Sequence, residues 1–88
     1  MSRVSVNYYY NKHITSRKEG IVERIYMKRM RDLREDHDKT QQQIAAVLGI
    51  SQTMYARYER GATELPLRHL IALCRYYGVS SDYLLGLV

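Results

Sequence analysis

The sequence lacks the features typical of secreted and membrane proteins, namely paired cysteines, a long apolar segment and a signal peptide. It contains one cysteine in 88 residues, so no internal disulfide is possible, which fits a reducing compartment. No apolar run approaches the roughly 20 residues of a membrane span, and the N-terminus lacks the apolar core of a signal peptide. We therefore expect a cytoplasmic protein that is not inserted in a membrane.

Groups for catalysis or metal binding are equally scarce. Cys74 falls on the apolar side of a predicted helix, where a buried small side chain is a better interpretation than a nucleophile. The histidines, His13, His37 and His69, share no metal-ligand spacing with each other or with Cys74. The five glycines form no phosphate-binding loop. We therefore expect no enzyme, no metal and no cofactor, and we expect His69 to be exposed opposite the core side of its helix.

Length and charge narrow the class of protein. Eighty-eight residues make one small domain, near the lower limit of length at which a hydrophobic core stabilises a fold without disulfides or bound metal. The net charge of +5 favours a polyanionic partner without proving one. Basic residues on an ordinary solvated surface explain the same charge equally well, so charge alone does not decide between the two.

The segment 40–59, TQQQIAAVLGISQTMYARYE, is the most informative part of the chain. It predicts two short helices joined by a Gly-Ile-Ser turn. Thr40 caps the first helix, and Gln43 completes a Thr-x-x-Gln capping box. Gly49 suits the left-handed conformation that ends this helix, and Ser51 caps the next one.

The two predicted helices bury one side and expose the other. Ile44, Ala45 and Leu48 share one side of the first helix, and Tyr55 and Tyr58 share the buried side of the second. The side chains left outside on the second helix are Gln52, Thr53, Ala56 and Arg57. Amide, hydroxyl and guanidinium groups on a helix held at a fixed angle suit the edges of DNA bases. We therefore interpret the second helix as one that reads DNA.

Three further helices are predicted around this pair. The first begins near Arg17 and has an apolar stripe formed by Val22, Tyr26, Met30 and Leu33. Another spans 67–77, between a proline and a glycine, with a core stripe formed by Leu70, Leu73, Cys74 and Tyr77. The last follows Ser80 as its cap. Its apolar residues either close the core or meet a second subunit.

The N-terminal segment is predicted to lie outside this domain, so that residues 1–20 form an extension and residues 21–88 form the domain. Residues 3–8 alternate as a strand does. A lone strand is unstable and must pair or stay mobile. An arm on DNA, a strand exchanged in a dimer, a contact with a protein partner and disorder all remain open.

Five short elements occur in a fixed order along the chain: MRDLRE, TQQQIAAVLGIS, YERG, LP and VSSDYLLG. With them the chain resembles, from Met30 to Gly86, the phage Cro/repressor-type helix-turn-helix family. The resemblance implies an all-α fold, a compact five-helix lambda-repressor-like DNA-binding domain with a short N-terminal extension. It also implies that the helix 52–60 docks in the major groove.

The chain departs from the family pattern at three positions. Tyr55 replaces a branched aliphatic residue, so the pocket beneath the second helix must be larger. Lys39 stands where an apolar residue is common and should weaken packing there slightly. Met54 stands where small polar residues are frequent, and its thioether suits a thymine methyl group.

The interpretation assigns two kinds of DNA contact. Base contacts are expected from Gln52, Thr53, Met54 and Arg57, with Gln52 suited to adenine and Arg57 to guanine. Phosphate contacts are expected from Gln41, Ser51, Arg60 and Thr63. Gln41 would act with the free N–H groups at the start of its helix, whereas Arg60 and Thr63 follow from the resemblance. A solvated charge is an equal alternative for Arg60. We expect Glu59 to order Arg57 or the following loop.

Two functional classes remain open. The first is a homodimeric, sequence-specific regulator of transcription, a repressor in our prediction, that binds two half-sites of duplex DNA about 34 Å apart. Its expected interface is Leu84, Leu87 and Val88, with Ile21 and Ile25 as second choice. The second class is an antitoxin-like or other interaction module, whose DNA binding is secondary and whose working surface includes Ile21, Ile25 and the tyrosine run.

Overall fold

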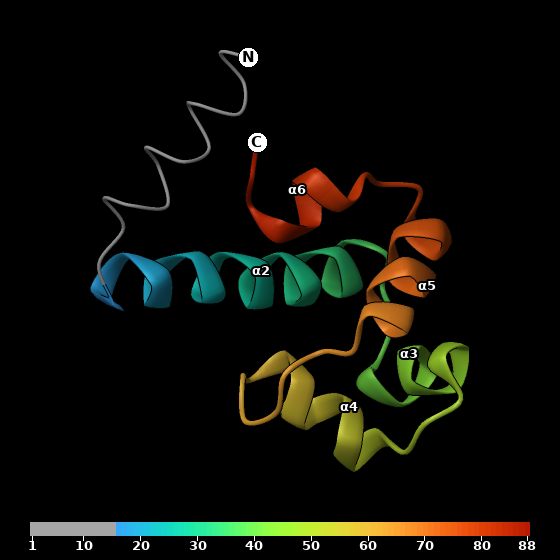
Figure 1. Cartoon of the computed structure of the whole chain (residues 1–88). Coiled ribbons are helices and arrows are strands. Elements are labelled where there is room, and N and C mark those ends of the chain that lie inside the picture. Colours follow the sequence, from blue (N-terminus) through green and yellow to red (C-terminus); the bar gives the residue numbers. More distant parts are fainter. Residues whose placement is uncertain (1–15) are drawn as a thin grey trace.

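The structure is a computed structural model, which describes the chain from residue 16 to residue 88 and its side chains from residue 25 onward. All regular elements in this part are helices. In chain order they are α2 (Ser16–Asp36), α3 (Gln41–Leu48), α4 (Gln52–Glu59), α5 (Leu67–Tyr77) and α6 (Ser81–Leu85) (Figure 1). The expected all-α fold of five helices is confirmed. The strand proposed for residues 3–8 lies outside the described residues.

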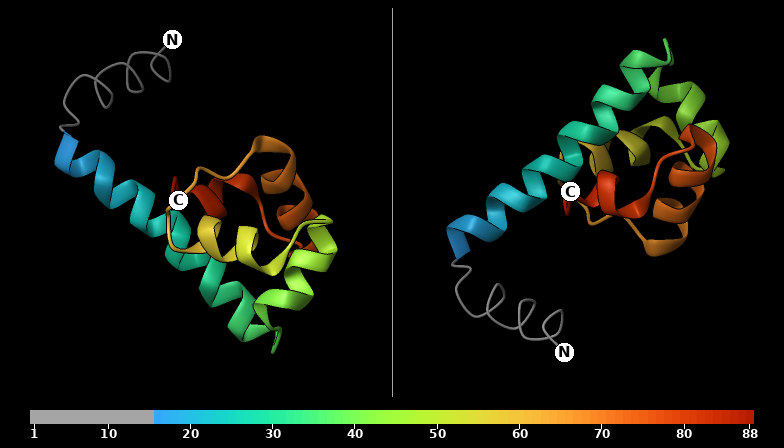
Figure 2. Two further views of the ribbon diagram at one scale, coloured as in Figure 1. Left: turned by 90° about the horizontal axis from the view of Figure 1, so that it is seen from below. Right: turned by 90° about the horizontal axis from the view of Figure 1, so that it is seen from above.

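The long helix α2 organises the arrangement of the other four. It runs along one side of the domain, and its N-terminal turns extend past the other helices (Figures 1 and 2). The α3–α4 pair packs near its C-terminal half, and α6 returns along it, so that α2 contacts both α4 and α6. Helix α5 connects the two groups because it packs on α3 and on α6. None of the described helices is long and apolar enough to cross a membrane.

The predicted caps set the ends of α3 and α4. Thr40 Oγ1 accepts a 3.1 Å hydrogen bond from Gln43 N, and Gln43 Oε1 accepts a 2.8 Å bond from Thr40 N, which completes the capping box. Gly49 ends α3 with φ = +71°. Ser51 Oγ accepts a 3.1 Å bond from Met54 N at the start of α4. These local signals fix the turn that aims α4.

The core lies where the five helices meet. Its buried apolar residues are Met30, Leu33, Ile44, Ala45, Tyr55, Tyr58, Leu70, Leu73, Tyr77 and Leu84. Tyr55 is fully buried, as the larger pocket predicted for this position requires. Leu84 is also fully buried. It therefore closes the core and does not belong to a surface where a second subunit binds, which corrects its expected place at a dimer interface. Leu87 and Val88 remain exposed.

His69 is buried, and the prediction of an exposed side chain at this position was wrong. Only 7% of the residue is accessible, and its ring lies 5.9 Å from the ring of Tyr58. The reason is its spacing, because His69, Leu73 and Tyr77 follow each other at steps of four and therefore share one side of α5. Its Nε2 has no hydrogen-bond partner in the described part of the chain. Burial, and then the charge of Arg68, lowers the pKa of His69.

Arg29 holds the end of the chain against α2. Its guanidinium donates hydrogen bonds to the backbone oxygens of Tyr83 and Val88, and it lies 4.3 Å from the centre of the Tyr83 ring. Gly86 ends α6 with φ = +79° directly beside Ile25. These contacts explain how α6, only five residues long, stays docked on α2.

Candidate nucleic-acid interface

The exposed side of α4 carries the four residues predicted to contact bases: Gln52, Thr53, Met54 and Arg57. They stand outside because Tyr55 and Tyr58, on the other side of the helix, are buried in the core. The helix therefore presents a row of polar side chains and one thioether to solvent. This is the arrangement that the sequence pattern predicted for α4, whereas the contacts themselves stay a prediction.

Arg57 and Thr63, assigned separately to a base and to a phosphate, lie together. Arg57 Nε donates a 3.1 Å hydrogen bond to Thr63 Oγ1. The loop that follows α4 therefore holds the guanidinium near the helix end. Arg57 keeps its remaining N–H groups, since a guanidinium has five donors, and it is exposed.

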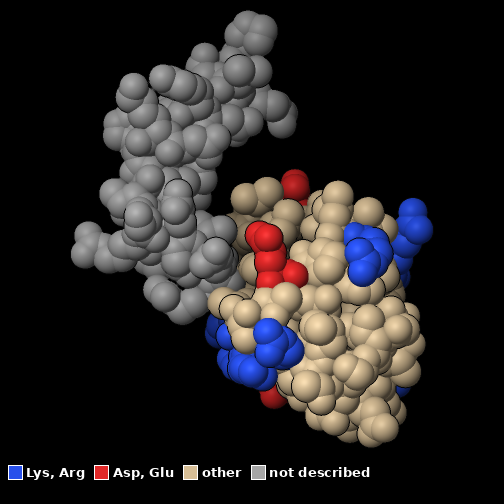
Figure 3. Space-filling view, turned by 60° about the horizontal axis from the view of Figure 1, so that its bottom comes forward, with Lys and Arg blue, Asp and Glu red and all other residues tan. Residues whose placement is uncertain are grey.

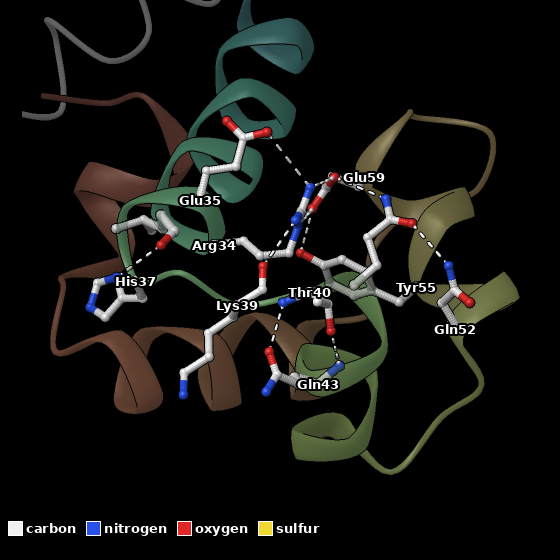
Figure 4. A network of polar contacts seen from close by, with 11 residues as sticks. Arg34, Glu35, His37, Lys39, Thr40, Gln43, Gln52, Tyr55 and Glu59 are labelled. Atoms are coloured by element: carbon white, nitrogen blue, oxygen red, sulfur yellow. Dashed lines mark hydrogen bonds and ion pairs between the residues drawn. The ribbon is translucent and has the colours of Figure 1, made fainter.

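Glu59 is the centre of a buried polar network (Figure 4). Its hydrogen bonds go neither to Arg57 nor to the loop after α4, so our expectation that it orders one of them was wrong. Arg34 of α2 holds it in two places, with Nε 2.9 Å from Oε2 and Nη2 3.0 Å from Oε1. The Tyr55 hydroxyl donates a 2.7 Å bond to Oε2, and Gln41 Nε2 donates a 3.1 Å bond to Oε1. The side chains of Arg34 and Glu59 are only 13% and 6% exposed. The network therefore ties α2, α3 and α4 together.

The protonation states of this network follow from its contacts. Burial raises the pKa of Glu59, but the hydrogen bonds from Arg34, Tyr55 and Gln41 outweigh it and hold the pKa below its ordinary value. The hydrogen bond to Glu59 raises the pKa of Arg34 although burial opposes it. Burial raises the pKa of Tyr55, which keeps its hydroxyl as a donor. Glu59 is therefore a carboxylate at neutral pH, and all its neighbours donate to it.

The Gln41 amide connects Glu59 to the exposed side of α4, because its orientation is set by the carboxylate. Because a carboxylate only accepts, Gln41 must turn its NH₂ group toward Glu59 and its Oε1 away from it. That oxygen accepts a 3.4 Å hydrogen bond from Gln52 Nε2 (Figure 4). Gln52 is left with Oε1 and one N–H. Gln41 was predicted to contact phosphate, but its side-chain amide bonds Glu59 and Gln52, which leaves its backbone N–H, at the start of α3, for that role.

The surface around α4 carries little charge. Helix α3 has no charged residue, and the only charged residues of α4 are Arg57 and the buried, paired Glu59. Figure 3, which brings the lower side of Figure 1 forward, shows a mainly uncharged surface with separate groups of lysine and arginine and a few acidic groups around it. The centre of this face is therefore suited to hydrogen bonding with neutral groups.

The reactive groups elsewhere in the described part of the chain form no cluster that could act as a metal site or a nucleophile. No cluster of three His, Cys, Asp or Glu side chains that could hold a metal ion occurs among the described residues. Cys74 is half-buried, and burial raises the pKa of its thiol. A raised pKa disfavours the thiolate, which is the nucleophilic form.

Comparison with known proteins identifies the family of this domain. The family described as helix-turn-helix matches residues 30–84. The Bacillus subtilis protein named uncharacterized HTH-type transcriptional regulator YobD is 43% identical over 63 residues, which are 72% of this chain and 56% of that protein. The cryptic phage CTXphi transcriptional repressor RstR of Vibrio cholerae is 31% identical over 55 residues, 62% of this chain and 50% of that protein.

A third relative carries a different name. Antitoxin PezA of Streptococcus pneumoniae is 32% identical over 59 residues, which are 67% of this chain and 37% of that protein. The chain thus spans about half the length, or less, of these three relatives. No solved structure gives a significant match.

Proposed function

The chain belongs to the helix-turn-helix family, and we propose that it is a sequence-specific regulator of transcription, a repressor, that reads the major groove of duplex DNA with the exposed side of α4. Such a protein acts in the cytoplasm, where bacterial and phage DNA lies. Two of the relatives are named as a transcriptional regulator and a transcriptional repressor, which supports this role.

The orientation of the Gln52 amide is the observation that carries the proposal. Glu59 orients Gln41, and Gln41 orients Gln52, so that Gln52 offers one acceptor and one donor to solvent. In the major groove adenine offers the complementary pair, the N6 donor and the N7 acceptor. A glutamine oriented in this way can make a two-pronged contact with adenine. The buried Glu59 carboxylate thus sets, through Gln41, the orientation in which Gln52 meets a base.

The other assigned residues complete the proposed contact. Thr53, Met54 and Arg57 reach bases beside the one that Gln52 reads. Phosphates are held by residues at the two ends of the α3–α4 unit: Gln41, Ser51, Arg60 and Thr63. Ser51 and the backbone N–H of Gln41 stand at helix N-termini, which favour anions.

We propose that the chain binds DNA as a homodimer, because one short helix reads too few bases to find a single site in a genome. Two exposed apolar residues at the chain end, Leu87 at 58% and Val88 at 74% exposure, favour an interface there. Sedimentation of the free protein and of its DNA complex tests this. A monomer in both samples would rule out the dimer.

A second candidate function is an antitoxin-like module, favoured by the likeness to Antitoxin PezA. In that case a protein partner binds the chain and DNA binding is secondary. Purification of the chain with the products of its neighbouring genes separates the two candidates. A stable complex with a neighbour favours the module, and an inverted repeat bound in the chain's own promoter favours the regulator.

Selection of bound sites from random duplex DNA is the experiment that tests the main proposal. We expect a defined half-site and an affinity that falls steeply with salt. If six to ten phosphates are contacted, affinity should fall about 10³- to 10⁵-fold between 50 and 200 mM salt. Failure to select any sequence, or binding that does not respond to salt, would contradict a role in DNA binding.

A further inference from the structure

A hollow of about 420 Å³ lies between α2 and the end of α4, beside the residues assigned to DNA. Lys28 and Arg31 of α2 line it together with Arg60, which follows the last residue of α4. Met27 and Glu59 complete the lining. Three basic side chains therefore surround one opening, two from α2 and one from the residue that follows α4, and the two from α2 do not belong to the contacts proposed so far.

The charges around this hollow are not cancelled. Arg31 and Arg60 are exposed and form no ion pair within the described part of the chain. Lys28 lies 2.6 Å from Asp32, but both side chains are open to solvent, where such a pair contributes little. Glu59 faces the hollow as a carboxylate that Arg34 already neutralises. The opening is therefore positively charged and attracts an anion.

The length of α4 indicates which anion reaches this place. Its eight residues rise about 12 Å, which is roughly the width of the major groove. Gln52 begins the helix and Arg60 follows its end. With Gln52 at a base edge, the far end of α4 comes to the margin of the groove, where the sugar-phosphate backbone runs.

We propose that Lys28 and Arg31, with Arg60, bind backbone phosphates of DNA beyond the base pairs that α4 reads. The inference rests on the proposed DNA binding and extends its footprint to the first helix. These contacts hold the C-terminal end of α4 at the groove margin, while the N-terminus of α3 holds the opposite end. They position the protein and carry no sequence information.

The first test compares two variants that each remove one positive charge. Arg31→Gln removes a side chain that lines the hollow, and Arg75→Gln removes an exposed one on α5 that does not. Binding to the selected duplex, with ten flanking base pairs on each side, is measured by fluorescence anisotropy from 50 to 300 mM salt. We expect Arg31→Gln to reduce the slope of log K against log salt by about 0.9, the value for one phosphate. Arg75→Gln should leave the slope unchanged.

The second test locates the phosphate. Single phosphates of the flanking DNA are replaced, one at a time, by uncharged methylphosphonates. We expect one or two positions at which this weakens binding of the wild-type protein but not of the double variant Lys28→Gln/Arg31→Gln. The preference for the selected site over a scrambled one should be the same in both proteins.

The outcomes separate the inference from the proposed function. Equal slopes for Arg31→Gln and Arg75→Gln, or no phosphate whose effect depends on Lys28 and Arg31, would overturn the phosphate site and leave DNA binding intact. A wild-type protein that prefers no duplex sequence would overturn the proposed function as well.

Discussion

Arg34 of α2 and Glu59 of α4 form a two-pronged ion pair in the interior, with nitrogen–oxygen distances of 2.9 and 3.0 Å. Removing one partner leaves the other as an uncompensated buried charge. We therefore expect Arg34→Met or Glu59→Leu alone to lower the free energy of unfolding by about 3–5 kcal/mol. Urea denaturation followed by circular dichroism measures it.

The double variant Arg34→Met/Glu59→Leu is the control for this prediction. Because it leaves no unpaired charge, we expect it to be more stable than either single variant. If the double variant instead lost the sum of the unfolding free energies lost by the two single variants, the two side chains would not act as a pair.

Gln52→Ala and Gln41→Ala test base reading by Gln52 and its orientation by Gln41. Gln52→Ala is expected to cost about 1–3 kcal/mol on the selected site and little on random DNA, because a base contact carries sequence information. Gln41→Ala keeps the backbone N–H proposed to bind phosphate but removes the side chain that orients Gln52, so it should lower affinity for the selected site and change binding to random DNA little. Neither residue is part of the apolar core, so both variants should fold. If Gln52→Ala weakens binding equally on every sequence, Gln52 contacts the backbone.

Glu59→Gln tests whether the carboxylate orients the amides on the surface. An amide can donate as well as accept, so Gln41 is no longer forced to turn its NH₂ group inward. We expect a reduced preference for the selected base opposite Gln52, measured on duplexes altered at that one base pair. Preferences at the bases opposite Thr53 and Met54 should stay. A uniform loss at all positions would instead indicate a general effect on folding.

Gly86→Ala and Gly78→Ala form a matched pair at the ends of α6 and α5. Both glycines have positive φ, +79° and +71°, so both substitutions carry a backbone cost of about 1–2 kcal/mol. A Cβ at Gly86 would also lie 2.6 Å from Ile25 Cγ2, whereas one at Gly78 meets no atom within 4 Å. We therefore expect the larger loss of stability for Gly86→Ala. Equal losses, measured by thermal unfolding, would contradict this close approach.

Stability should fall as the solution becomes acidic, because of His69. Its pKa in the folded protein lies below the ordinary 6.5, so the unfolded chain takes up the proton first as the pH falls. The stability linked to its neutral form is complete above about pH 6.5 and is lost as the pH falls toward the folded pKa. We expect His69→Leu to reduce the slope of unfolding free energy against pH between pH 5 and 6.5. An unchanged slope would assign it to another group.

Local sequence signals were enough to predict the helix boundaries around the turn and the buried side of α4. Each helix boundary around the turn depends on a cap or a glycine within a few residues, such as Thr40, Gly49 and Ser51, and these act alike in any context. Helical spacing likewise identified Tyr55 and Tyr58 as buried. The same spacing rule extended by one step would have placed His69 in the core.

The polar network could not be predicted in the same way. Arg34 and Glu59 are 25 residues apart, and spacing along the sequence does not tell which charges meet between helices. Glu59 lies next to Tyr58 and one helical turn after Tyr55, two buried residues, which was the available signal that its side chain also turns inward. The hollow formed by Lys28, Arg31 and Arg60 depends on the packing of α2 against α4 and had no signal in the sequence.

The hydrogen-bonded series from Glu59 to Gln52 has a consequence for how binding preferences diversify. Gln52 is linked through Gln41 to the buried Glu59, so a substitution at position 52 also leaves the Gln41 oxygen without its hydrogen-bond donor. Thr53 and Met54 are exposed on the same helix and have no such link among the contacts of the described residues. In the proposed mode of binding, substitutions at positions 53 and 54 therefore alter the reading of DNA one residue at a time, whereas a substitution at position 52 also releases the side chain of Gln41.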